Sequence, residues 1–170
     1  MKFKQANEPK NEEVENNLYA SFSKILQLEE DKIELVVAAI NYFYVHGNMK
    51  YKKFFKELHK MCCKTKLCFE EFMYIKFNKL PERTIASIDL DDFKEDIKFF
   101  ELLSTYEDDY DKLIKSTISE AFEEQDWDVY EYLIKKLDEI DHLCCRALEA
   151  VKNKSDLLDL ILCEQHSLEK

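Results

Sequence analysis

The chain has 170 residues with one glycine and two prolines, and its 25 Lys and Arg residues against 36 Asp and Glu residues give a formal net charge of -11. So few turn-forming residues exclude a sandwich or barrel of many short strands, and a single glycine excludes a glycine-rich nucleotide-binding loop. A strongly negative chain repels nucleic acid and anionic membranes, and no apolar stretch approaches the roughly 20 residues that cross a bilayer. We therefore expect long amphipathic helices, with neither nucleic acid nor a membrane as partner.

Four long helical patterns and one short one follow a polar segment at the start of the chain. Residues 1–15 are predicted to form a flexible N-terminal tail, and residues 16–170 a single helical domain. In chain order, the helical patterns cover residues 18–44, 49–77, 91–122, 126–154 and 156–166.

The connections between these helices predict their topology. The first and second helices, and the third and fourth, are joined by only a few residues and should form antiparallel hairpins. Residues 78–91 could span about 46 Å when extended, whereas a helix of about 27 residues is about 40 Å long. The predicted fold is therefore an all-α four-helix bundle with one long crossover between helices two and three and a short fifth helix.

In three of the four long helices, a single carboxylate interrupts the apolar stripe: Glu30, Glu107 and Asp141. A buried carboxylate is costly unless it is paired or bound to metal, and three in one core repel one another unless they are protonated or bridged by a cation. The stripes could instead be mis-phased by one residue, so that Glu30 points outward and shares its surface with Glu29 or Asp31, and Ile140 takes the place of Asp141.

The chain contains six cysteines: Cys62, Cys63, Cys68, Cys144, Cys145 and Cys163. Their spacing is not of a zinc-binding type, and the polar start of the chain gives no indication of export. We interpret them as reduced, small core residues of a cytoplasmic protein, with a soft-metal or redox site that includes Cys68 as the alternative. The histidines are each isolated in the sequence and are expected at the surface or at helix ends.

From Leu26 to Leu148, the chain resembles the ferritins. The resemblance is collinear, and these residues carry it: Glu30, Asn41-Tyr42-Phe43-Tyr44, Phe54, Phe55, Glu107, Ala121, Asp126, Leu133 and Asp141. Residues 155–168 resemble the short C-terminal helix of that family. The resemblance implies cytoplasmic iron storage and a 24-subunit cage, built from this chain alone or with other ferritin subunits.

The resemblance also implies metal ligands. Ferritins that oxidise Fe(II) hold a di-iron centre inside the bundle, and Glu30 and Glu107 match two of its glutamates. Asp141 falls where a fourth-helix glutamine usually lies. On the second helix, the bridging glutamate falls on Thr65 and the histidine falls on Cys68.

These departures imply an impaired centre. With Thr65 in place of the bridging glutamate, a pair of irons would lack the negative charge between them. With Cys68 in place of the histidine, a thiol replaces an imidazole ligand. In the ferritins, acidic residues on the second helix line the storage cavity of the cage, and Glu70 matches one of them. We therefore expect iron at a single rather than a paired site and weak or absent ferroxidase activity, with these candidate metal ligands: Glu30, Glu107, Asp141, Glu70 and Cys68.

Two other functions are compatible with the sequence. The chain could be a non-catalytic helical-bundle interaction protein, either divergent or of a viral type, because a fold alone does not determine function. It could also be a working ferroxidase with an altered ligand set.

Overall fold

The structure is a computed structural model, and it describes residues 12–85, 87–140 and 142–157. These residues form helices and connecting segments with no strand among them, which confirms the all-α prediction. None of the described helices is long and apolar enough to pass through a membrane. In chain order, the elements are α1 (Glu12–Val45), α2 (Met49–Phe77), the 3₁₀ turn η1 (Leu90–Asp92), α3 (Ile97–Glu123), α4 (Trp127–Asp138) and α5 (Leu143–Lys152).

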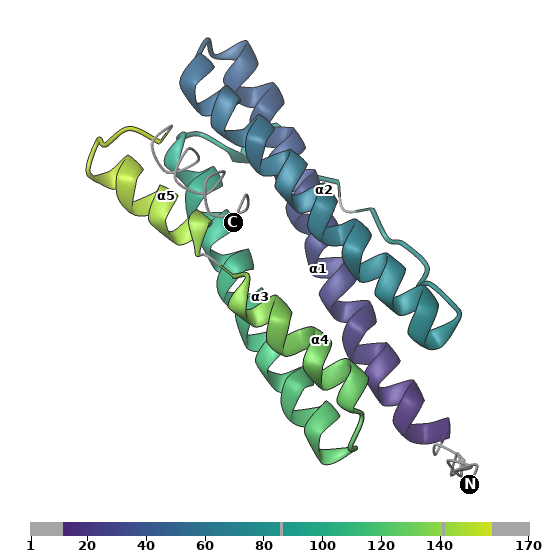
Figure 1. The fold of residues 1–170 in the computed structure, drawn as a ribbon. Helices are drawn as coiled ribbons and strands as arrows, with labels where there is room; N and C mark the ends of the chain where they lie inside the picture. Colours follow the sequence, from purple (N-terminus) through teal and green to yellow (C-terminus); the bar gives the residue numbers. More distant parts are fainter. Residues whose placement is uncertain (1–11, 86, 141, 158–170) are drawn as a thin grey trace, which may run out of the picture.

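The helices form two antiparallel hairpins that lie side by side (Figure 1). One hairpin consists of α1 and α2, and in the other α3 packs against both α4 and α5. The two hairpins meet mainly where α1 contacts α3. The segment between α2 and α3 returns along the first hairpin to the end of the bundle where α3 begins (Figure 1), so the predicted long crossover is confirmed.

Contacts with α1 fix this crossover in place. The Lys79 ammonium lies 4.0 Å from the centre of the Tyr19 ring, a cation–π contact of the kind that aromatic faces offer to lysine. The Gln27 side chain donates a 2.8 Å hydrogen bond to the backbone carbonyl of Thr84. The crossover is therefore held at its start and near its middle.

The ends of α2 agree with the predicted bounds because local sequence signals define them. Gly47, with a φ of 73°, provides the turn after α1. The Asn48 side chain then accepts a hydrogen bond from the Tyr51 backbone N–H and caps the helix. Asn78 ends it in the left-handed conformation, which asparagine tolerates better than most residues.

The first and third helices begin at different residues from those predicted. Residues 12–15, expected in the N-terminal tail, already belong to α1, and residues 1–11 lie outside the described part. Around residue 91 the chain forms the short η1 turn, because the Asp89 carboxylate accepts a hydrogen bond from the Asp91 backbone N–H. The Phe93 ring then stacks on Phe99 at 4.0 Å, and α3 starts only at Ile97.

The predicted continuous fourth helix is wrong, because it is broken into α4 and α5 between Asp138 and Leu143. His142 adopts a left-handed conformation with a φ of 48°, although the break contains neither glycine nor proline. The predicted fifth helix, residues 156–166, lies almost wholly outside the described residues. Its first two positions, 156 and 157, are described and are not helical.

Two apolar clusters fill the interior, one towards each end of the bundle. The first surrounds aromatic residues near the α1–α2 turn, among them Phe43, Phe55 and Phe100. The second includes Phe22 and Phe69, nearer the α3–α4 turn. The buried carboxylates Glu29 and Glu107 therefore lie between two apolar layers.

Candidate functional site

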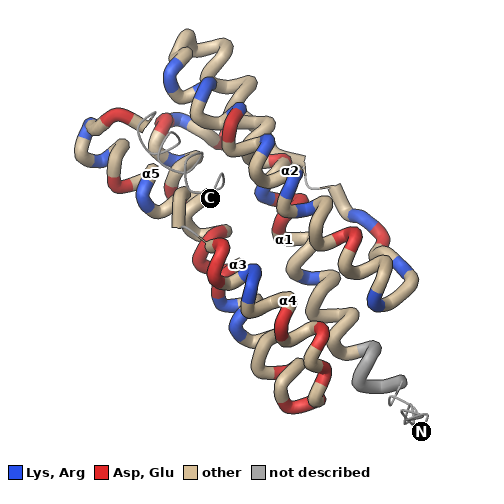
Figure 2. Tube along the Cα trace, viewed as in Figure 1, with Lys and Arg blue, Asp and Glu red and all other residues tan. Residues whose placement is uncertain are grey.

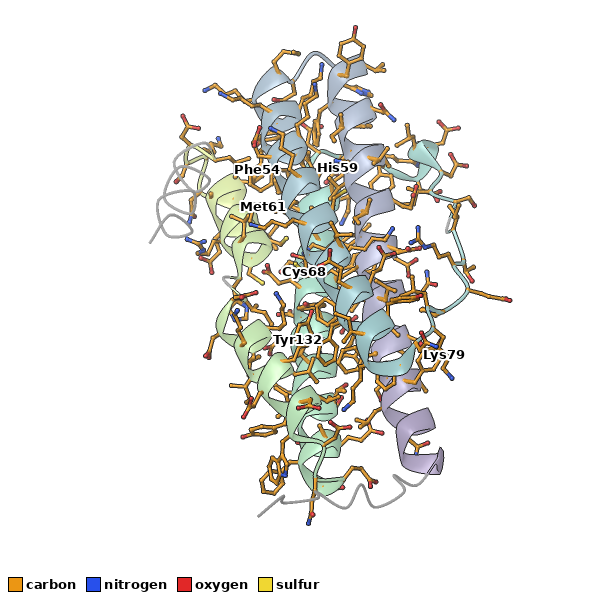
Figure 3. The ribbon with its side chains drawn as sticks, turned by 45° about the vertical axis from the view of Figure 1, so that its right-hand side comes forward. Phe54, His59, Met61, Cys68, Lys79 and Tyr132 are labelled. Carbon is orange, nitrogen blue, oxygen red and sulfur yellow. The ribbon has the colours of Figure 1, made fainter. Side chains whose placement is uncertain are left out.

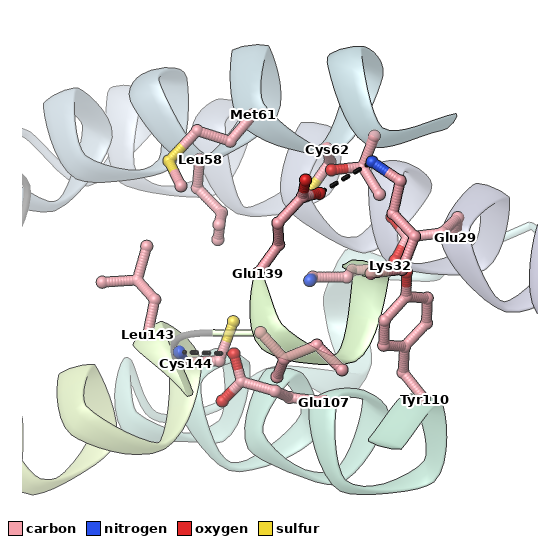
Figure 4. A pocket seen from close by; sticks show the side chains of 13 residues that line it. Glu29, Lys32, Leu58, Met61, Cys62, Glu107, Tyr110, Glu139, Leu143 and Cys144 are labelled. Atoms are coloured by element: carbon pink, nitrogen blue, oxygen red, sulfur yellow. Dashed lines mark hydrogen bonds and ion pairs between the residues drawn. The ribbon is translucent and has the colours of Figure 1, made fainter. Parts of the chain in front are cut away.

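A cavity of about 120 Å³ lies in the middle of the bundle and is lined by residues from both hairpins (Figure 4). The polar and thiol side chains that line it include Glu29 and Lys32 from α1, Cys62 and Thr65 from α2, Glu107 from α3 and Cys144 from α5. Charged groups buried in such a place are costly unless they neutralise one another or bind a partner.

Glu29, and not Glu30, is the buried carboxylate of α1. Its exposed fraction is 2%, and its Oε2 atom has no hydrogen-bond partner among the described residues. Burial raises its pKa, Lys32 opposes that rise, and the negative charge of Glu107 adds to it. The apolar stripe predicted through Leu26 and Glu30 is therefore shifted by one residue, which is the alternative that the sequence left open.

Lys32 places a positive charge inside the cavity, one helical turn beyond Glu29. Its side chain extends towards the space between Glu139 and Glu107 (Figure 4). Burial disfavours the charged ammonium, but the negative charges that Cys144 and Cys62 carry when ionised, together with those of Glu29 and Glu107, outweigh that effect and hold the Lys32 pKa well above its usual range. The cavity therefore contains a cation that is part of the chain itself.

Glu107 closes the cavity on the α3 side and caps the N-terminus of α5. Its exposed fraction is 6%. One carboxylate oxygen accepts a 3.1 Å hydrogen bond from the Cys144 backbone N–H, and the other accepts a 2.9 Å bond from that of Cys145. These N–H groups lie in the first turn of α5, where no carbonyl within the helix can accept them. Glu107 thus stabilises the break between α4 and α5.

Two of the cysteines face this cavity as neutral thiols. Burial raises the pKa of Cys62 to about 12 and holds that of Cys144 well above its usual range. Both side chains are buried, as the interpretation of the cysteines as small core residues predicts. Cys68 is half-buried and lies near Tyr132 rather than on the cavity lining; both residues are labelled in Figure 3.

The structure brings Glu30 and Glu70 together, but outside the cavity and around two cations. Lys66 Nζ lies 2.9 Å from a Glu30 carboxylate oxygen and 3.9 Å from one of Glu70. Arg83, from the crossover, has its Nε 3.2 Å from Glu30 and also pairs with Glu70. These two predicted metal ligands therefore form an ion-pair cluster that joins α1, α2 and the crossover.

Of the remaining predicted ligands, Glu107 is on the cavity lining, while Asp141 lies outside the described residues. Sequence reasoning missed Lys32, although a signal for it exists. A stripe started at Leu18 and continued at alternating steps of four and three residues passes through Phe22, Ile25, Glu29 and Lys32. Starting the stripe at Leu26 placed every later position one residue too far along.

A second group of potential ligands was also missed, at the break before α5. One ligand atom each from Glu107, His142 and Cys145 lies within 4.8 Å of the other two. His142 and Cys145 are three residues apart, a spacing that places side chains on one helical face. The break that directs His142 towards Glu107 has no sequence signal of its own.

No protein-family model and no curated protein matches the chain by sequence. Its fold, in contrast, is shared with solved ferritin structures. An open-pore ferritin from Archaeoglobus fulgidus superposes with a TM-score of 0.73 at 13% identity, covering 89% of this chain and 95% of that one. A Chlorobium tepidum ferritin gives 0.70 at 12% identity over 91% and 97%. A humanized archaeal ferritin gives 0.73 at 14% identity over 89% and 93%.

These likenesses show that the chain has a ferritin-like helical bundle. The cavity does not have the donors for a pair of irons. Di-iron carboxylate sites use bridging glutamates with histidines, whereas the residues lining this cavity include no histidine among those described, and α2 contributes no carboxylate to the lining described. The Lys32 ammonium adds a positive charge that opposes a metal ion at the same place.

Proposed function

We propose that this chain is a ferritin-like subunit for cytoplasmic iron storage, with an impaired di-iron oxidation centre and iron as cargo. The observation that carries the proposal is the bundle itself, which superposes on ferritins over about nine-tenths of its length. A further similar structure, a PmFTN variant at 11% identity and a TM-score of 0.66 over 85% of this chain and 97% of that one, was soaked in iron.

The impaired centre is proposed from the interior charges. Three carboxylates line the cavity, Glu29, Glu107 and Glu139, an arrangement that attracts a cation. Lys32 already supplies a positive charge there, and Lys136 pairs with Glu139. We therefore propose that Fe(II) is oxidised slowly by this chain alone, and that storage relies on assembly, with self or with other ferritin subunits.

Assembly has support on the outer surface of the first hairpin. Several large apolar side chains of α1 and α2 remain exposed in the single chain, including Val37, Tyr44, Leu67 and Tyr74. Where exposed apolar side chains form one contiguous patch, they are typical of surfaces that are covered by another protein chain. The proposal assigns them to contacts between subunits.

Sedimentation velocity followed by iron loading tests the proposal. A cage of 24 chains of 20.4 kDa has a mass of about 490 kDa, and it should retain iron after aerobic loading with Fe(II) and desalting. Tyr74→Lys should reduce the assembled fraction, while Lys53→Ala, which removes a lysine from the same helix, is the matched control. A chain that stays monomeric or dimeric and retains no iron would instead support the interaction-protein alternative.

A further inference from the structure

The break between α4 and α5 brings together three side chains of different chemistry. Glu107 comes from the middle of α3, His142 from the residue before α5, and Cys145 from its first turn. One oxygen, one nitrogen and one sulfur of this set lie within 4.8 Å of one another. We propose that Glu107, His142 and Cys145 form a binding site for a single borderline-soft divalent cation, with Zn²⁺ as the preferred ion.

The donor set selects the class of metal. Zn²⁺ binds cysteine sulfur at about 2.3 Å and histidine nitrogen or carboxylate oxygen at about 2.0–2.2 Å, in tetrahedral geometry. Donor atoms on one such ion are about 3.4–3.8 Å apart, so donor atoms that lie up to 4.8 Å apart need to close by about 1.4 Å at most. His142 is exposed, and its side chain is free to make that adjustment.

Two of the three ligands are held in place before any metal binds. The Glu107 carboxylate is fixed by the backbone N–H groups of Cys144 and Cys145. The Cys145 sulfur lies 3.1 Å from the Ser104 hydroxyl and 3.8 Å from an Asp108 carboxylate oxygen. The Glu107 carboxylate and the Cys145 thiol are therefore oriented by neighbouring groups, and preorganisation of this kind lowers the cost of binding.

Metal binding at this site releases a proton. Burial, together with the carboxylates of Glu107 and Asp108, raises the pKa of Cys145 to about 11, although the Ser104 hydroxyl opposes that rise. The thiol is therefore protonated at neutral pH. On binding, the S–H bond breaks, a sulfur–metal bond forms, and the proton passes to solvent.

Cobalt titration of the iron-free, full-length protein under reducing conditions tests the proposal. One Co²⁺ per chain should bind with a thiolate-to-cobalt charge-transfer band and the visible bands of a four-coordinate ion, and Zn²⁺ should displace it. Cys145→Ser should abolish the charge-transfer band, and His142→Ala should weaken binding by about tenfold or more. Circular dichroism of each variant verifies that the helices remain.

The chain offers a matched control on α2. His59 and Cys63 form a pair on α2, with the exposed Cys63 sulfur 3.6 Å from a ring nitrogen, and no carboxylate among the described residues completes a metal site there. His59→Ala and Cys63→Ser should leave the cobalt spectrum and affinity unchanged. A band that persists in Cys145→Ser, or one that disappears in Cys63→Ser, would overturn the proposal. Because iron storage is not needed for this binding, failure of cage assembly would not affect the result.

Discussion

Lys32 determines which cations the middle of the bundle can hold. At about 4 Å and an effective dielectric constant of about 20, two unit charges interact by about 4 kcal/mol, and a divalent ion doubles that repulsion. The attraction from Glu29 and Glu107 is shared with the ammonium that already lies in the cavity. A lysine therefore replaces part of the charge that a metal ion would supply.

The effect of Lys32 on iron chemistry can be measured directly. Thr65→Glu adds a carboxylate to the cavity lining, but the new charge should pair with Lys32 and leave Fe(II) oxidation slow. Adding Lys32→Gln removes the ammonium and should raise the initial oxidation rate in air by tenfold or more, since each tenfold corresponds to about 1.4 kcal/mol. Lys66→Gln, at the Glu30 cluster, is the control lysine. Equal rates with and without Lys32 would contradict this account.

The buried thiol of Cys62 should make stability depend on alkaline pH. Its pKa is raised from 9.0 to about 12 in the folded chain, so between these values the unfolded state loses the proton while the folded state keeps it. The free energy of unfolding must then fall as pH rises, by up to about 1.4 kcal/mol per pH unit for this group.

Urea unfolding between pH 8 and pH 11 should show this slope. Cys62→Ala should be less stable at every pH because it leaves a small cavity, but its stability should fall less steeply than that of the natural chain. Cys63→Ala, at the neighbouring exposed position, should keep the original slope. If Cys62→Ala and the natural chain lose stability in parallel, the thiol is not responsible.

At the scale of elements, the start of α4 depends on one buried carboxylate. Asp126 accepts a hydrogen bond from the Val129 backbone N–H at 3.3 Å, and Lys76 Nζ, from the end of α2, lies 2.7 Å away. The side chains of Asp126 and Lys76 are only 8% and 12% exposed. This pair joins the α3–α4 turn to the far end of the first hairpin.

Two aspartates in contact with Lys76 allow a matched test of this junction. Asp126→Ala removes the cap and the closer partner of a largely buried ammonium, and it should cost about 2–4 kcal/mol in the free energy of unfolding. Asp128 lies 3.4 Å from the same nitrogen but is 82% exposed, so Asp128→Ala should cost at most about 0.5 kcal/mol. Comparable losses in the two variants would show that burial of Asp126 does not matter.

Elements that carry their own end signals could be predicted from the sequence, and α2 is the clearest case. Gly47, Asn48 and Asn78 define its ends locally. The break between α4 and α5 could not be predicted in this way, because its stabilising group, Glu107, comes from α3 and is distant in the sequence. The cavity residues show the same difference. Glu107 was predicted on the buried face of its helix and is buried there, whereas the burial of Glu29 and Lys32 depends on which face of α1 turns inward.

At the scale of the whole molecule, helix lengths and the length of the crossover were enough to predict the bundle. The charges are distributed unevenly over it, with Lys and Arg frequent along α2 and with Asp and Glu gathered around the α3–α4 turn (Figure 2). The molecule therefore has a basic stretch and an acidic region, although its net charge is -11. The basic stretch of one copy would attract the acidic region of a neighbouring copy at low ionic strength.

The separation of α5 from α4 affects the local stability of α5. Because α4 ends at Asp138, α5 begins at Leu143 and α5 packs mainly against α3, we expect the ten residues of α5 to behave as a separate cooperative unit. Such a unit can open while the remainder of the bundle stays folded. Amide protons of α5 should therefore exchange with solvent through local opening, at a lower free energy than those in the middle of α3. The two hydrogen bonds to Glu107 set how much lower that free energy is.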